Sequence, residues 1–277
     1  MSNLPCYDRP HVAKLRVLAF GVMMGNTKDK LRGGQPALGG WIMIGHPSVA
    51  EILAGEGCFD WLAVDMEHTS TTVRMFHELS LAVKGTGVDL LVRLPGLDPQ
   101  LTKQVLDSGA DGIIVPSVNT AAQAQEAVAM AKFPPAGHRG ASLCRATDFG
   151  RNFAPYYREH NNRVLVVCML EHIDAVRNVD AILAVPGIDA TFIGPYDLSA
   201  SLGLAGQTGH PDVLAAQQTI LAACQRHAVP AGIHVVPTDG AEVSRRIAQG
   251  FRFIACGIDT EFLQFAARHM FREIKRG

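Results

Sequence analysis

The chain lacks the cysteine pattern of an exported or zinc-binding protein. Its six cysteines are spread over 277 residues without a C-x-x-C pair, and several lie inside apolar runs. This usage indicates buried free thiols in a reducing compartment rather than disulfides or zinc ligands. We therefore expect a cytoplasmic protein.

Long apolar runs and dense blocks of basic residues are also missing. No apolar run approaches the roughly 20 residues that a membrane span requires. The formal net charge is −1, with no cluster of Lys and Arg. Membranes and nucleic acids are therefore not expected as partners. A hydrophobic fraction of 48% with 18% charged residues excludes a disordered chain and is typical of a compact enzyme.

The amino terminus differs from the rest of the chain. Lys14 and Arg16 precede an apolar segment over residues 17–24 that faintly resembles a signal peptide, but no clean small-residue cleavage site follows it. We expect residues 1–25 to be an extension without a targeting role. Because no linker, repeat or low-complexity tract interrupts residues 26–277, we expect them to form a single domain.

Beyond this extension, short apolar runs alternate with amphipathic, Ala- and Leu-rich segments that are typical of helices. Eight strands alternating with helices over about 240 residues predict a TIM (β/α)8 barrel, although a doubly wound open sheet has the same local pattern. The connection after Val115 is unusually long, which is typical of a lid or binding loop. The expected strands are Trp41–Ile44, Trp61–Val64, Leu90–Leu94, Gly112–Val115, Val164–Leu170, Ala190–Ile193, Ala231–Val236 and Phe253–Cys256.

Two successive strands of this pattern are followed by carboxylates. The fifth strand stops at Glu171, and Asp197 follows the sixth strand after a helix-length connection between the two. In such a βαβ unit both residues project from the carboxyl-terminal edge of a parallel sheet, where ligands bind. Paired carboxylates at this edge suit a divalent cation, while the alternative role for Asp197 is to cap the next helix.

Three further side chains are candidates for the same site. His68 follows the second strand, where an imidazole suits a general base unless it is only a surface-loop residue. Arg93 ends the third strand, where a guanidinium needs either a structural carboxylate partner or an anionic ligand. Asp107 closes the helix before the fourth strand, as a solvated turn residue or as the partner that orients His68. Together with two carboxylates, this set favours proton abstraction beside a carbonyl, with a metal holding the enolate oxygen.

Three longer stretches resemble the HpcH/HpaI aldolases, metal-dependent pyruvate aldolases that cleave 4-hydroxy-2-oxo acids. The stretches are Phe59–His68, Pro134–Gly140 and Phe192–Ser199, and the resemblance runs in order from about Gly39 to Asp259. The resemblance implies divalent metal, Mg²⁺ or Mn²⁺ with Co²⁺ as a further candidate. The roles that it implies are the catalytic base for His68, the carboxylate that raises its basicity for Asp107, enolate stabilisation for Arg93, and metal ligation for Glu171 and Asp197.

The resemblance also implies how the chain meets its substrate and its neighbours. Gly194, Pro195 and Tyr196 fall where backbone groups contact the bound 2-oxo acid. A homo-oligomer, a hexamer or trimer of dimers, is implied, in which a carboxyl-terminal helix packs on a neighbouring subunit. The amphipathic segment Glu261–Ile274 is the candidate for that helix.

The chain departs from the family pattern at three positions expected to face the substrate. Met169 replaces the usual glutamine two residues before the metal-binding glutamate, and it can neither donate nor accept a hydrogen bond well. His234 replaces an aliphatic residue, and Tyr196 replaces a small one. Metal binding is therefore expected to be retained, while the aldehyde and the substrate preference stay open.

The expected function is that of a class II retro-aldol lyase, which cleaves a 4-hydroxy-2-oxo acid to pyruvate and an aldehyde through a metal-bound enolate. One alternative is an acyl-CoA lyase or 2-oxo acid decarboxylase with the same enolate chemistry, although the chain shows no clear basic rim for CoA. A second alternative is a barrel that binds a 2-oxo acid without catalysis, with Met169 as its sign.

Overall fold

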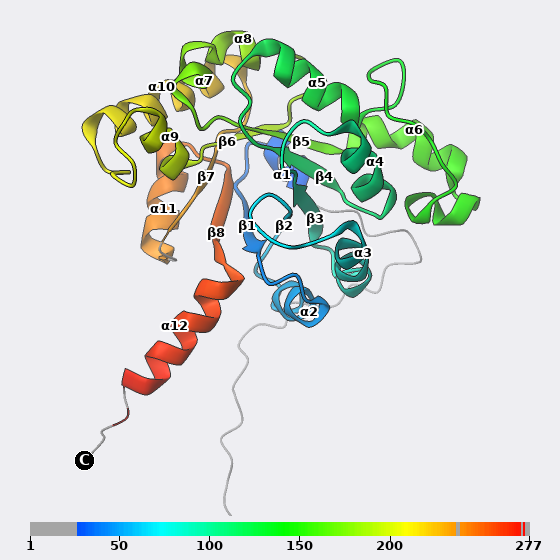
Figure 1. Cartoon of the computed structure of the whole chain (residues 1–277), viewed down its shortest axis with the longest axis horizontal. Coiled ribbons are helices and arrows are strands. Elements are labelled where there is room, and N and C mark those ends of the chain that lie inside the picture. Colours follow the sequence, from blue (N-terminus) through cyan, green and yellow to red (C-terminus); the bar gives the residue numbers. More distant parts are fainter. Residues whose placement is uncertain (1–26, 237–238, 273, 275–277) are drawn as a thin grey trace, which may run out of the picture.

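The strands of the computed structural model, which describes residues 27–236, 239–272 and 274, form one barrel (Figure 1). The strands pair in parallel, in the order β6-β5-β4-β3-β2-β1-β8-β7, and a bridge between Ile193 and Ile233 brings β6 to β7. The sheet therefore almost closes on itself, which decides between the barrel and the open sheet. The strands are β1 (Ala37–Ile42), β2 (Trp61–Asp65), β3 (Asp89–Arg93), β4 (Gly112–Val115), β5 (Leu165–Met169), β6 (Ala190–Phe192), β7 (Gly232–His234) and β8 (Phe253–Ile258).

The eight predicted strands are confirmed, but β1 begins at Ala37 instead of Trp41. The apolar pattern of the sequence does not mark the start of β1, because the strand runs through Gly39 and Gly40. A Cβ atom at Gly39 would lie 2.0 Å from the ring of Trp61, so this position admits only glycine. A strand that needs glycine for close packing has a weak apolar signal.

Helices surround the barrel and follow the predicted amphipathic segments. Several begin at a side-chain cap, such as Thr120 before α5 and Asp98 before α4. The amphipathic segment between β5 and β6 is divided at Asn178 into two short helices, α7 and α8. The helices are α1 (Thr27–Arg32), α2 (Pro47–Gly55), α3 (Val73–Ala82), α4 (Pro99–Asp107), α5 (Ala121–Ala131), η1 (Arg145–Gly150), α6 (Phe153–Arg163), α7 (Ile173–Arg177), α8 (Val179–Leu183), α9 (Pro195–Ser201), α10 (Pro211–His227), α11 (Gly240–Gln249) and α12 (Asp259–Arg272). None of the helices in the described ranges is long and apolar enough to span a bilayer.

Aromatic side chains fill the inside of the barrel. Trp61 stacks on Phe253 with ring centroids 4.2 Å apart, and Trp41 meets Phe192 edge-on at 5.5 Å. These residues belong to an inner cluster that is separate from the larger aliphatic core between the strands and the helices. Trp41 and Phe192 lie near the carboxyl ends of their strands, so aromatic rings form the floor under the mouth of the barrel.

Aspartates tie the amino ends of the strands together. Asp60, Asp111 and Asp189 precede β2, β4 and β6, and each accepts a hydrogen bond from the backbone N–H of the second residue of the preceding strand, at 2.9, 2.8 and 3.0 Å. Lys28 of α1 lies across the same end and contacts Asp189 at 2.9 Å and the carbonyl oxygen of Val164 at 2.6 Å. This end of the barrel is closed by structural polar contacts, which leaves the carboxyl ends for a ligand.

The long connection over residues 132–164 also lies at the amino ends of the strands. It joins the end of α5 to the start of β5 and contains η1 and α6. Arg145 fixes it there, because its guanidinium donates to the carbonyl oxygens of Ser108 and Ser80, which end α4 and α3. The connection is therefore not a lid over the mouth of its own barrel, contrary to what its length indicates.

Candidate active site

Glu171 is the most strongly perturbed carboxyl group at the mouth of the barrel. It follows β5, is buried, and its Oε1 accepts a hydrogen bond from the backbone N–H of Ser117 at 2.7 Å. Ser117 has φ 54°, an uncommon conformation for a residue other than glycine, and this conformation accompanies the contact. Burial, with smaller contributions from the charges of Asp197 and Glu67, raises the pKa of Glu171 to about 7. A nearby cation would stabilise the charged form of such a carboxylate.

Asp197 reaches the same site from the first turn of α9. The helix begins at Pro195 and has Gly194 as its N-cap, without a side-chain cap. Asp197 therefore does not cap this helix, which removes the alternative that the sequence left open. A Cβ atom at Gly194 would lie 2.5 Å from Oε2 of Glu171, so the absence of a side chain at Gly194 leaves room for the second carboxylate oxygen. Tyr196, next to Asp197, is exposed at the rim.

Arg93 is held in a fixed orientation at the end of β3. Its Nε and Nη2 donate to the two carboxylate oxygens of Asp65, both at 2.8 Å, and Nε lies 3.4 Å from Glu67. Its guanidinium carbon lies 4.7 Å from the centre of the Trp41 ring. Burial raises the pKa of Glu67, although Arg93 acts in the opposite direction. The guanidinium is thus pre-organised toward one side of the mouth.

His68 lies at the outer part of the mouth. Its side chain is 60% exposed, and its Nε2 lies 3.4 Å from a carboxylate oxygen of Glu67. Through Glu67 it is connected to Arg93, so three side chains from the ends of β2 and β3 form one polar chain. An imidazole in this place is open to a substrate and to water, as a proton-transferring group has to be.

The structure does not bring Asp107 together with His68. Asp107 ends α4, which leads to the amino end of β4, whereas His68 follows the carboxyl end of β2. The two residues therefore lie at opposite ends of one barrel. The partner of Asp107 is Arg139, whose buried guanidinium donates to its carboxylate at 2.6 Å. The role of Asp107 in orienting His68 therefore stays a prediction, because the two residues are far apart within a single chain.

The positions that depart from the family pattern line the mouth and its floor. Met169 ends β5 and is buried in the inner cluster. His234 ends β7, with its ring 6.2 Å from that of Trp41. A cavity of about 340 Å³ opens beside these strand ends, between α9, α10 and α11, and its lining includes Pro195, Tyr196 and His234.

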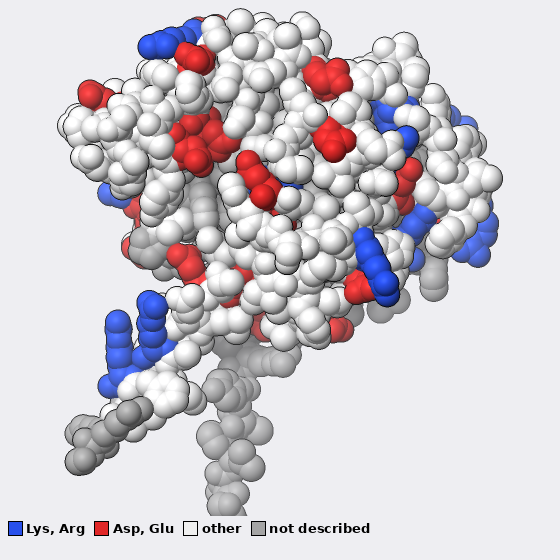
Figure 2. Space-filling model, in the orientation of Figure 1, with Lys and Arg blue, Asp and Glu red and all other residues white. Residues whose placement is uncertain are grey.

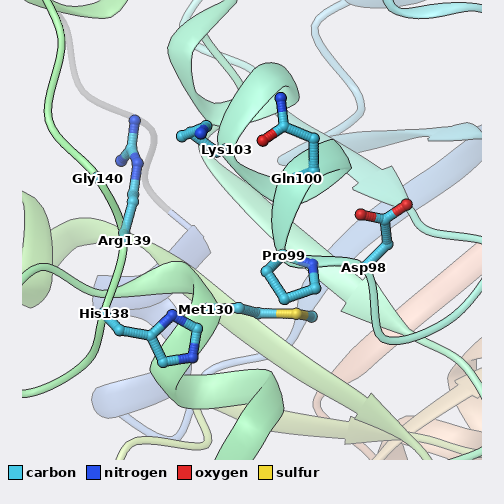
Figure 3. Close-up of a pocket in the computed structure, with 8 residues that line it drawn as sticks. All are labelled: Asp98, Pro99, Gln100, Lys103, Met130, His138, Arg139 and Gly140. Carbon is cyan, nitrogen blue, oxygen red and sulfur yellow. The ribbon is translucent and has the colours of Figure 1, made fainter.

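A second cavity of similar volume lies between α4, the end of α5 and the segment that follows α5 (Figure 3). The first residues of α4 and the segment His138–Gly140 form two of its sides, and Met130 of α5 contributes a thioether. The imidazole of His138 is paired with Glu126 at 3.1 Å. This cavity contains none of the predicted site residues, so we do not assign the reaction to it.

Residues that the sequence analysis did not single out complete the site. Asp65 orients Arg93, Glu67 connects it to His68, Ser117 orients Glu171, and Trp41 supports the guanidinium. Asp65 and Glu67 stand beside His68 in a motif that was recognised, so their acidic character was a usable signal. Ser117 and Trp41 carried no such signal because their roles depend on contacts between distant strands.

The carboxylates fit a divalent metal ion. The charge of Asp197 contributes to the raised pKa of Glu171, and Oε2 of Glu171 lies in the space that Gly194 leaves. Hard oxygen ligands are those that Mg²⁺ and Mn²⁺ prefer. Figure 2 shows several acidic side chains toward the middle of this face and most basic ones at its periphery. Among the described residues no group of three or more His, Cys, Asp or Glu is placed to hold a metal, so two protein ligands would leave positions for water and substrate oxygens.

Fold and site together define a TIM-barrel protein with paired carboxylates at the carboxyl ends of its strands. The sequence model of the HpcH/HpaI aldolase/citrate lyase family matches residues 38–266. The chain belongs to this family, which confirms the resemblance seen in its motifs.

Proteins similar to the chain include named aldolases. It is 41% identical to a 4-hydroxy-2-oxovalerate aldolase of Novosphingobium aromaticivorans, over 86% of this chain and 89% of that protein. It is 38% identical to a hydroxypyruvate/pyruvate aldolase of Roseobacter denitrificans, over 92% and 98%. The crystal structure of an HpcH/HpaI aldolase/citrate lyase family protein from Burkholderia cenocepacia superposes with a TM-score of 0.85 at 35% identity, covering 90% of this chain and 99% of that one.

Proposed function

We propose that the protein is a metal-dependent lyase that cleaves a 4-hydroxy-2-oxo acid to pyruvate and an aldehyde, and catalyses the reverse aldol addition. The observation that carries this proposal is Glu171, a buried carboxyl group with a raised pKa beside Asp197 at the mouth of the barrel. The relatives named as aldolases support the reaction class.

The chain's own residues have separate tasks in this proposal. Glu171 and Asp197 would hold a divalent cation, Mg²⁺ or Mn²⁺, which supplies positive charge where the enolate oxygen of pyruvate develops. Arg93 adds a second positive group at the same oxygen, and its contacts to Asp65 keep it from turning away. The N–H groups of Tyr196 and Asp197, in the first turn of α9, would donate to the carboxylate of the 2-oxo acid, since this helix has no side-chain cap.

His68 is the proposed proton-transferring group. In the cleavage direction it removes the proton from the C4 hydroxyl, the C3–C4 bond breaks, and the aldehyde leaves. A proton then returns to C3, which gives the methyl group of pyruvate. Glu67, 3.4 Å from the imidazole, stabilises its protonated form.

We also propose that the protein is a homo-oligomer. The apolar side chains Leu263, Phe265, Met270 and Phe271 of α12 are more than half exposed. Burial of such a surface against another copy of the chain would remove it from water.

Free cysteines throughout the described chain support a reducing compartment such as the cytoplasm.

Replacement of Glu171 tests the proposed reaction. Glu171→Gln keeps the size of the side chain but removes its charge, so metal-dependent exchange of the pyruvate methyl protons should fall at least about a hundredfold. The exchange is followed by NMR in D2O with Mn²⁺ or Mg²⁺, and with EDTA as a blank.

Asp174→Asn is the matched control, because Asp174 is an exposed carboxylate on the next helix that pairs with Arg177. Its exchange rate should equal that of the wild type. Exchange that persists in Glu171→Gln, or in the presence of EDTA, would show that this carboxylate does not hold an essential metal.

A further inference from the structure

Two buried ring nitrogens at the floor of the mouth have no hydrogen-bond partner within the described part of the chain. They are Nε1 of Trp41 and Nε2 of His234, on rings whose centroids are 6.2 Å apart. The other tryptophan of the chain behaves differently, since Nε1 of Trp61 donates to the carbonyl oxygen of Ala37 at 3.3 Å. The barrel therefore satisfies one indole and leaves the other unpaired.

An unpaired buried nitrogen is unfavourable for folding alone. Leaving such a group without a partner costs about 1–3 kcal/mol, whereas an apolar side chain of similar size would pack at these positions without that penalty. Both residues lie at the carboxyl ends of strands, β1 and β7, where this fold binds its ligands. A ligand group is thus a natural partner for the two nitrogens.

The chemistry of the two ring nitrogens favours a neutral ligand group that both donates and accepts hydrogen bonds. Burial, together with the nearby charge of Arg93, lowers the pKa of His234 to about 4. The imidazole is therefore uncharged near neutral pH and can donate or accept, while the indole only donates. A carboxylate only accepts hydrogen bonds, so a hydroxyl group, which also donates, is the better complement of the pair.

The position of His234 indicates that this hydroxyl group belongs to the substrate. Its side chain lines the cavity of about 340 Å³ together with Pro195 and Tyr196, the residues that precede Asp197. The χ2 torsion of histidine is broad, so a rotation of the ring would bring Nε2 to the cavity that the side chain lines. Because Pro195 and Tyr196 directly precede Asp197, this cavity adjoins one of the proposed metal ligands.

We propose that His234 and Trp41 form a subsite for a substrate hydroxyl group, so that the enzyme selects hydroxylated substrates over their unsubstituted analogues. This inference rests on the proposed aldolase function. The hydroxyl belongs either to the aldehyde, as in a 2-hydroxyaldehyde, or to the 2-oxo acid, as in a 3-hydroxy-2-oxo acid. The chemistry is the same in both cases, and two arms of one experiment separate them.

The experiment measures kcat/KM in the aldol direction with two matched substrate pairs. One arm compares glycolaldehyde with acetaldehyde, each with pyruvate, and the other compares hydroxypyruvate with pyruvate, each with acetaldehyde. In the arm that carries the recognised hydroxyl, the hydroxylated substrate should be favoured by at least about tenfold, as expected for a buried polar group that gains its partner. In His234→Leu this ratio should fall to within about twofold of one, and His234→Gln should recover part of it.

A surface variant and a spectroscopic signal complete the test. His227→Leu alters an imidazole that pairs with Asp180 away from the mouth, and its substrate ratios should equal those of the wild type. In the wild type with Mg²⁺, the indole N–H resonance of Trp41 should shift with the preferred hydroxylated substrate and not with its analogue, while that of Trp61 stays in place. This signal remains decisive if His234→Leu does not fold.

The two proposals fail in different ways. Absence of pyruvate methyl-proton exchange in the wild type would count against the aldolase function itself. If exchange occurs but the ratios of both arms are the same in wild type and His234→Leu, or the indole resonance of Trp41 does not respond, the hydroxyl subsite is refuted and the aldolase function stands.

Discussion

The glycine at position 194 shows how a missing side chain can shape a metal site. Its backbone has φ −93°, which alanine adopts without strain, so the obstacle to a side chain is steric. A methyl group at this position would meet Oε2 of Glu171 at 2.5 Å and its Cβ at 3.1 Å. The side chain of Glu171 would have to move, which would change the position of its carboxylate relative to Asp197.

We therefore expect Gly194→Ala to weaken Mn²⁺ binding by at least about tenfold while the protein stays folded, because ligand orientation has effects of this size on metal affinity. Titration followed by EPR of free Mn²⁺ measures the dissociation constant. Gly209→Ala is the control, since a Cβ atom there meets nothing within 4 Å. Equal affinities for the two variants would show that the room beside Glu171 is not required.

At the scale of elements, the connection over residues 132–164 is a rigid structural unit. The guanidinium of Arg139 is buried between the rings of Phe133 and Tyr156, pairs with Asp107, and lies 2.7 Å from Nε2 of His160. Burial and the charge of Arg139 lower the pKa of His160 to about 3. The imidazole is therefore neutral in the folded protein at pH values where it is protonated in the unfolded chain.

This difference predicts how stability depends on pH. Between about pH 6.5, the usual value for an unfolded histidine, and pH 3, the unfolded state binds one more proton at this site than the folded state. The free energy of unfolding should therefore fall as the pH is lowered through this window, by up to about 1.4 kcal/mol per pH unit from His160.

His160→Gln removes this contribution. The free energies of unfolding of wild type and variant, plotted against pH, should therefore converge as the pH falls from 8 to 4.5. Urea unfolding at several pH values measures them. Parallel curves would show that folding does not lower the pKa of His160.

At the scale of the whole molecule, α12 extends away from the barrel (Figure 1). Only its first residue, Asp259, is buried, where it accepts hydrogen bonds from the backbone N–H groups of Met43 and Ile44. Beyond this anchor, the described part of the chain leaves apolar side chains of the helix exposed to solvent.

We expect the double variant Leu263→Glu and Phe271→Glu to shift the protein to a smaller assembly, because two charges would have to be buried in the proposed interface. Size-exclusion chromatography with light scattering gives the mass. Gln264→Glu adds a charge at another exposed position of the same helix, and its mass should match that of the wild type. A monomeric wild type would contradict the proposed oligomer.

The sequence by itself determined the eight-strand rhythm and the mouth of the barrel. Period and length of apolar runs identify strands and helices because each strand must be covered on both faces, and carboxylates that follow β5 and β6 must emerge at one edge of a parallel sheet. Glu171, Asp197 and Arg93 could therefore be placed together before any coordinates were known. The resemblance to the family added Mg²⁺ or Mn²⁺ as the expected metal and retro-aldol cleavage as the expected reaction.

Only the tertiary structure decided which groups touch. Pairing of Arg93 with Asp65, support by Trp41, and orientation of Glu171 by Ser117 join residues from different strands, and no local pattern records such contacts. The same holds for the partner of Asp107, because its contact with Arg139 joins the end of α4 to the connection before β5. Spacing along the chain sets the edge at which a residue emerges, but packing sets its partner, because side chains meet across strands and helices that are distant in sequence.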